Sequence, residues 1–239
     1  MIAPIVLLIV PLISGIMVWK VRPTSRKSIK LLLAFSGAYL LGLSVLHLIP
    51  EVYADAPKVA GFSILAGFVI QLLLEFLSGG IEHGHFHHHS KNERHFPIAL
   101  IISLVLHSFL ECLPLSQGHA HHVDSGFGLV AGISIHNIPV GITLMSILIQ
   151  SGLERRTILL SYLAFSVAGP VGYFTGYFGS QVLQDLSSQF YQMSTGVVVG
   201  IFLHVSTTIL FESGEGHRFN LFKLASIVVG SALAYLAIM

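Results

Sequence analysis

The stretch PIALIISLVLHSFLECLPL, residues 97–115, is apolar and long enough to cross a bilayer, yet it holds a histidine and a glutamate in its middle. About 20 consecutive apolar residues predict a transmembrane helix. Ionisable side chains at membrane depth cost free energy, so His107 and Glu111 indicate a functional site. Their four-residue spacing places them on one face of a helix, about 40° apart around its axis.

Seven further apolar stretches of similar length divide the rest of the chain, at about 2–19, 31–51, 60–79, 127–149, 157–181, 190–212 and 219–238. Of the 239 residues, 54% are apolar and 10% are charged, whereas a soluble domain carries roughly 25% charged residues. We therefore predict an all-α, polytopic membrane protein with about eight transmembrane helices. The few scattered basic residues exclude a nucleic-acid partner. The first stretch lacks a basic segment and a cleavage site, so it is expected to be a retained helix.

The lysines and arginines predict the orientation in the membrane. With the N-terminus outside, eleven of the twelve basic residues fall in or beside cytoplasmic loops, and only Lys58 lies outside. Such an imbalance is typical of multi-pass membrane proteins, and it places both termini outside. We predict a single transmembrane domain over 1–239, with a cytoplasmic histidine-rich loop at about 80–96 and an outer histidine-rich loop at about 116–126.

A second polar motif, His136-Asn-Ile-Pro-Val140, interrupts the stretch 127–149. The predicted topology puts His107 and His136 each about ten residues into oppositely directed helices, near the membrane midplane at about 1.5 Å per residue. Imidazole nitrogen and carboxylate oxygen suit a divalent cation such as Zn²⁺. The predicted metal site comprises His107, Ser108, Glu111, His136 and Asn137. The alternatives are a buried histidine–glutamate hydrogen bond between helices and a simple kink at the proline.

Further histidines and acids lie toward the two ends of the helices. Candidates for metal capture on the outer side are His47, Glu51, His119, His121, His122 and Asp124. Candidates for release on the inner side are His204, Glu212, His83, His85, His87, His88 and His89. Each also has a structural interpretation, as an interfacial cluster, a packing group or a loop that binds metal weakly. A role in the metal pathway is also considered for three further polar residues, on weaker grounds: Gln71, Glu75 and Gln181.

The chain resembles the ZIP family of divalent-metal transporters over nearly its whole length. The shared segments are His47-Leu-Ile-Pro-Glu51, His107-x-x-x-Glu111, His136-x-x-Pro139 and Gly200-Ile-Phe-Leu-His-Val205. The resemblance implies an inverted repeat, in which helices one to three are related to helices six to eight around helices four and five. It also implies alternating access and a homodimer.

The sequence departs from the family pattern beside the predicted metal site. Cys112 follows Glu111 where the family has glycine, and it is the only cysteine, so no intrachain disulfide can form. Val140 stands where many members have a second carboxylate, and Gly169 where some bacterial members have a glutamate. These departures predict one bound metal rather than two bridged metals.

The predicted function is transport of a divalent cation into the cytoplasm across the cell (inner) membrane, with Zn²⁺ as the first candidate. The metal is then substrate, with no resident cofactor and no enzymatic activity. One alternative is a membrane metalloenzyme, because His85-x-x-His88-His89 resembles a histidine box of desaturases and hydroxylases. Another is a metal sensor that uses the same fold without flux.

Overall fold

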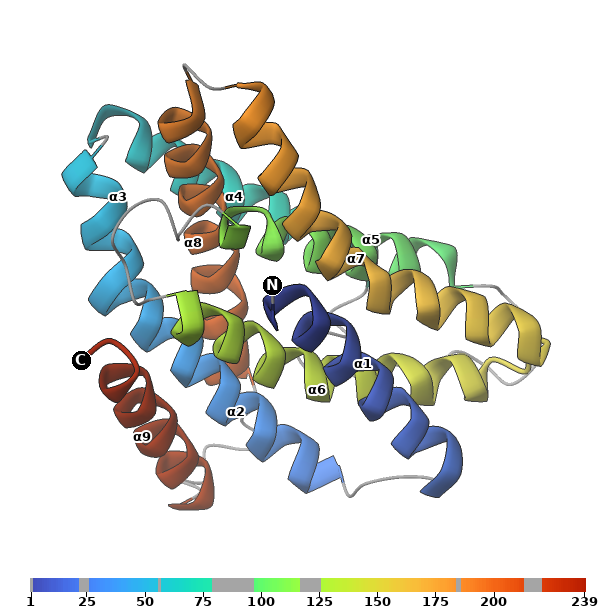
Figure 1. Cartoon of the computed structure of the whole chain (residues 1–239). Coiled ribbons are helices and arrows are strands. Elements are labelled where there is room, and N and C mark those ends of the chain that lie inside the picture. The colour runs from blue at the N-terminus through green and yellow to red at the C-terminus, as the bar shows by residue number, and fades with distance from the viewer. Residues whose placement is uncertain are drawn as a thin grey trace.

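The computed structural model describes residues 2–21, 26–55, 57–78, 97–116, 126–183, 186–212 and 221–239. Within these ranges the chain is helical apart from short turns, and no strand occurs. The helices are shown in Figure 1: α1 (Ile2–Val21), α2 (Arg26–Leu43), α3 (Ile49–Asp55), α4 (Pro57–Ser78), α5 (Ile98–Cys112), α6 (Gly126–Gln150), α7 (Arg155–Val182), α8 (Ser187–Glu212) and α9 (Leu221–Leu236). A π-helical turn, η1 (Ser44–Leu48), joins α2 to α3, and a 3₁₀ turn, η3 (Pro114–Ser116), follows α5.

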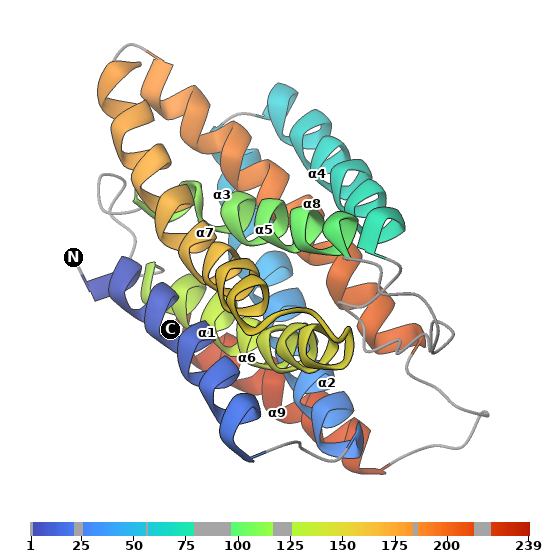
Figure 2. The ribbon, with the colours of Figure 1, turned by 90° about the vertical axis from the view of Figure 1, so that its right-hand side faces the viewer.

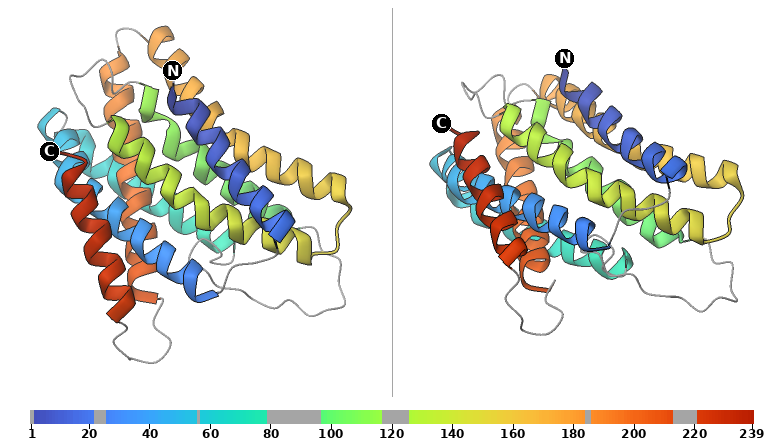
Figure 3. Two further views of the ribbon diagram at one scale, coloured as in Figure 1. Left: turned by 60° about the horizontal axis from the view of Figure 1, so that its bottom comes forward. Right: turned by 90° about the horizontal axis from the view of Figure 1, so that it is seen from below.

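Seven helical segments in the described ranges are long and apolar enough to cross a bilayer. One of them, Lys27–Ala54, runs through α2, η1 and α3. The eighth apolar segment, α9, is shorter. This confirms the prediction of an all-α polytopic membrane protein. Both termini lie at one end of the helix bundle, as Figure 3 shows, while the side of the membrane that they face stays a prediction.

The spans pack as two groups of four. The first group contains α1, α5, α6 and α7, and the second contains α2, with its extension α3, and α4, α8 and α9. Contacts within each group are more extensive than those between the groups, which run mainly through α4 with α5 and α2 with α6. In Figure 2, α5 and α8 lie close together where the groups meet.

The packing pairs helices in the manner of an inverted repeat. α4 packs along α8 as α9 packs along α2, and α1 packs along α6 as α7 packs along α5. Suppose that the first three spans are exchanged in order with the last three, and the fourth with the fifth. The pair α4–α8 then becomes α9–α2, and the pair α1–α6 becomes α7–α5. This arrangement supports the inverted repeat that the family resemblance implies.

Glycines let the helices of these pairs approach closely. A Cβ atom on Gly200 of α8 would lie 2.0 Å from the carbonyl oxygen of Ile64 in α4. A Cβ atom on Gly230 of α9 would lie 2.4 Å from the carbonyl oxygen of Phe35 in α2. Small residues at such crossings are typical of transmembrane helix packing, because they allow backbone-to-backbone contact.

Gly200→Val is expected to destabilise the protein, because the new side chain would push α8 away from α4. Overpacking of a close-packed interface costs about 1–3 kcal/mol, and thermal unfolding in detergent measures the loss. Gly61→Val is the matched control, because a Cβ atom there meets only the Tyr53 hydroxyl at 3.4 Å. Equal melting temperatures for the two variants would contradict the close α4–α8 contact.

Candidate metal centre

Three metal-ligating side chains converge between α5 and α6. His107 and Glu111 come from α5 and His136 comes from α6, and all three are fully buried. One nitrogen or oxygen atom from each lies within 4.8 Å of the others. The two imidazole rings have centroids 5.9 Å apart and are inclined at 67°. In the part of the chain that the structure describes, no other three His, Cys, Asp or Glu side chains come so close together.

The carboxylate of Glu111 lies beside His107 without a hydrogen-bond donor. Its Oε1 atom is 2.8 Å from Nε2 of His107, one helical turn away. Neither oxygen of Glu111 accepts a hydrogen bond from the described residues. Because a buried carboxylate is costly unless charges or donors compensate it, a cation between Glu111 and His107 would supply compensation beyond this one contact.

The other ring nitrogen of His107 contacts α4. Nδ1 lies 2.8 Å from Oε1 of Gln71, which is itself fully buried. Gln71 is only a weak candidate from its sequence position, and this contact makes it part of the surroundings of the site. The feature of the sequence that points to Gln71 is its position one turn before Glu75 in an otherwise apolar helix.

The two remaining predicted ligands differ in their surroundings. Asn137 is 1% exposed, and its Oδ1 atom accepts no hydrogen bond from the described residues, so it is free to bind a cation. Ser108 is 2% exposed and faces α7, because a Cβ atom built on Gly169 would lie 3.5 Å from its Oγ atom. The ligand roles of both residues stay predictions.

The positions where the family pattern would place further carboxylates are closely packed. A Cβ atom on Gly169 would lie 3.3 Å from the sulfur of Cys112, so α7 approaches α5 with little room for a side chain. Val140 of α6 is buried and offers no ligand atom. That the site holds one metal rather than two stays a prediction.

The candidates on the predicted outer side form a separate cluster. His47 lies in the π-helical turn η1 and Glu51 follows in α3, with Nε2 and Oε2 3.6 Å apart. The hydroxyl of Tyr191 in α8 donates a hydrogen bond of 2.9 Å to Oε1 of Glu51. Single π-helical turns are frequent at functional sites. The two side chains are partly buried, but the facing Nε2 and Oε2 atoms are themselves buried and have no hydrogen-bond partner among the described residues.

His204, the release candidate in α8, pairs with Glu75 of α4. Its Nε2 atom contacts Oε2 of the carboxylate, and its ring meets Phe68 edge-on with centroids 4.8 Å apart. The sequence marks both residues as polar within apolar helices but does not indicate that they meet. The pairing ties α8 to α4 one helical turn along α4 from Gln71, and neither residue of the pair is among the three donors that lie within 4.8 Å of one another.

The remaining candidates cannot be placed. His83, His85, His87, His88, His89, His119, His121, His122, Asp124 and the side chain of Glu212 lie outside the described residues. Gln181 is exposed at the end of α7.

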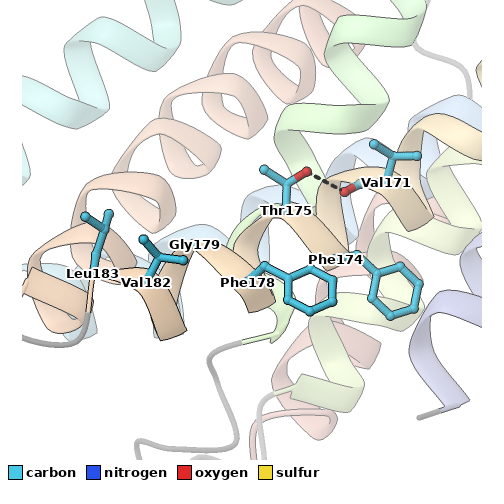
Figure 4. A pocket seen from close by; sticks show the side chains of 7 residues that line it. All are labelled: Val171, Phe174, Thr175, Phe178, Gly179, Val182 and Leu183. Carbon is cyan, nitrogen blue, oxygen red and sulfur yellow. Dashed lines mark hydrogen bonds between the residues drawn. The ribbon is translucent and has the colours of Figure 1, made fainter.

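The outer surface of α7 carries a shallow groove of a different kind. Figure 4 shows its lining, which is Val171, Phe174, Thr175, Phe178, Gly179, Val182 and Leu183. Its one polar side chain, Thr175, donates a hydrogen bond of 2.8 Å to the carbonyl oxygen of Val171. The groove is an apolar surface suited to lipid, and its lining contains no His, Cys, Asp or Glu.

Fold and site together describe a polytopic helical membrane protein with nitrogen and oxygen donors buried among its spans. Residues 82–237 match the family described as "ZIP Zinc transporter". This match covers more than half of the chain, which therefore belongs to the ZIP family, as the sequence motifs indicate.

A curated relative agrees with this assignment. The zinc transporter ZIP9 of Micropogonias undulatus is 28% identical over 167 residues, which are 65% of this chain and 52% of that protein. The chain thus spans about half the length of the curated relative that it matches. Membership of a transporter family does not favour the metalloenzyme or the sensor.

Proposed function

We propose that this protein transports a divalent cation into the cytoplasm, with Zn²⁺ as the first candidate. The observation that carries the proposal is the buried convergence of His107, Glu111 and His136, with donor atoms within 4.8 Å of one another. Two imidazoles and one carboxylate are a common protein ligand set for Zn²⁺, and a fourth position completes a tetrahedron. Asn137 Oδ1 or a water molecule would fill that position.

The route of the cation follows the clusters along the bundle. His47, Glu51 and the outer loop residues would gather the ion, and the buried donors would then replace its hydration shell. Release would pass His204 and Glu75 toward Glu212 and the inner histidine-rich loop. The division into two groups of four helices suits alternating access, in which one group moves against the other around a site at their boundary.

The distribution of basic residues and the family resemblance predict the orientation, the membrane and the oligomeric state. The positive-inside distribution favours a cytoplasmic position for the loop at about 80–96, and the family resemblance favours import across the cell (inner) membrane by a homodimer. The metal is cargo, so the proposal includes neither a resident cofactor nor an enzymatic step.

Zinc flux into proteoliposomes tests the function. Purified full-length protein, reconstituted with a zinc-sensitive dye inside the vesicles, is expected to raise the dye signal well above that of protein-free vesicles. Loss of the signal in His107→Ala would link flux to the site. Tight zinc binding without flux would instead identify a sensor, and oxygen-dependent turnover of a lipid would identify the enzyme.

Uptake is expected to decrease as the external pH is lowered. Histidine must be neutral to bind metal, so protons compete with the cation. Initial uptake rates from about pH 5.5 to about pH 7.5, roughly one unit to either side of the ordinary histidine pKa near 6.5, measure the decrease at fixed free zinc. A rate that is constant over this range would contradict histidine ligation.

A further inference from the structure

We infer that Gln71 is a positioning residue for the metal ligand His107. Its side-chain carbonyl holds the imidazole with Nε2 toward Glu111, and it does so across the boundary between the two groups of helices. The inference rests on the proposed function, because it assigns Gln71 a role only if His107 binds metal.

The hydrogen bond between the two side chains determines which ring nitrogen is available. Nδ1 of His107 lies 2.8 Å from Oε1 of Gln71. A neutral imidazole carries its proton on one nitrogen only. If Nδ1 donates that proton to the amide oxygen, Nε2 presents its lone pair on the side of the ring where Glu111 lies at 2.8 Å. The ring is thus held in a ligating tautomer and orientation.

Burial makes this contact effective. Both Gln71 and His107 are fully buried, so water does not replace the amide oxygen if the side chain is removed. Histidine ligands of metals generally donate their second N–H group to an oxygen that fixes the tautomer, and loss of that oxygen typically costs 10–100-fold in metal affinity.

The contact also joins the two groups of helices. Gln71 is on α4 in one group and His107 is on α5 in the other. One turn earlier in α5, the hydroxyl of Ser103 donates a hydrogen bond of 2.5 Å to the carbonyl oxygen of Leu74. Sliding α5 along α4 by one turn, about 5.4 Å, would break both bonds. Only the bond to Gln71 involves a proposed ligand, so this movement would free the His107 ring and weaken the metal site.

Zinc affinity of the purified full-length protein in detergent, measured by competition with a chromophoric chelator, tests the inference. Gln71→Leu keeps the size of the side chain but removes the acceptor oxygen, and we expect 10–100-fold weaker binding. Gln71→Glu keeps an acceptor oxygen at the same reach, and we expect affinity equal to or tighter than that of the wild type. Ser103→Ala removes the neighbouring interhelical bond and is expected to leave affinity unchanged.

The outcomes separate this inference from the proposed function. If His107→Ala loses zinc while Gln71→Leu binds like the wild type, the role of Gln71 is overturned and the metal site stands. If Gln71→Glu falls as far as Gln71→Leu, a packing role replaces the positioning role. If His107→Ala binds zinc like the wild type, the proposed site itself fails. Should Gln71→Leu not fold, Gln71→Asn, whose oxygen falls short of His107, is expected to bind as weakly, and wild-type affinity in that variant would overturn the inference.

Discussion

Replacing Glu111 with glutamine is expected to lower zinc uptake by on the order of 100-fold or more. Glu111 supplies the only negative charge among the three converging donors, and all three are fully buried. Glutamine keeps the shape of the side chain but leaves a desolvated dication without charge compensation, which a low-dielectric interior penalises strongly. Loss of a mere hydrogen-bond partner of a ligand costs 10–100-fold, so loss of the ligand charge should cost at least as much.

Glu154→Gln provides the matched control for this variant. Glu154 is exposed immediately before α7, so the same chemical change occurs far from the donors. Uptake of radioactive zinc, normalised to the amount of monodisperse protein, compares the two variants. Wild-type uptake by the Glu111→Gln variant would show that transport does not need the Glu111 carboxylate as a ligand.

Glu75→Leu is expected to lower stability by about 1–3 kcal/mol, the cost of leaving a largely buried polar group without its partner. The change leaves His204, which is 6% exposed, without the carboxylate that it contacts between α4 and α8. Removing one partner of such a pair leaves the other polar group unsatisfied, whereas replacing both partners with apolar side chains is often neutral. We therefore expect the double variant Glu75→Leu, His204→Leu to recover most of the lost stability. Thermal unfolding of the two variants in detergent measures the difference, and equal melting temperatures would contradict the pairing.

The double variant also decides between the two interpretations of His204. If the pair only holds α8 against α4, a stable double variant should transport zinc at the wild-type rate. If the pair receives the cation on its way inward, uptake should be slow while zinc affinity at the central site is unchanged. Measuring flux and affinity on the same preparation distinguishes the two.

The membrane spans could be predicted from the sequence because hydropathy is a local property. The predicted stretch 97–115 corresponds to α5 with η3, and 127–149 corresponds to α6. The spacing of His107 and Glu111 likewise fixes their relative position, because it depends only on helical geometry. The placement of His136 beside them followed from topology and from depth in the membrane.

Contacts that depend on the register between distant helices could not be predicted in this way. Gln71 reaches His107 across 36 positions of sequence, and Glu75 reaches His204 across 129. Hydropathy marks each of these residues as unusual in its helix but does not say which neighbour it meets. The π-helical turn at His47 is equally invisible in an apolar pattern, since it changes the helical path by a single residue.

The most direct test of the central claim is an anomalous-scattering map of crystals grown with zinc. A single peak is predicted between α5 and α6, about 2.0–2.2 Å from ligand atoms of His107, Glu111 and His136. A zinc peak elsewhere among the spans, with these three side chains not bound to it, would contradict the account.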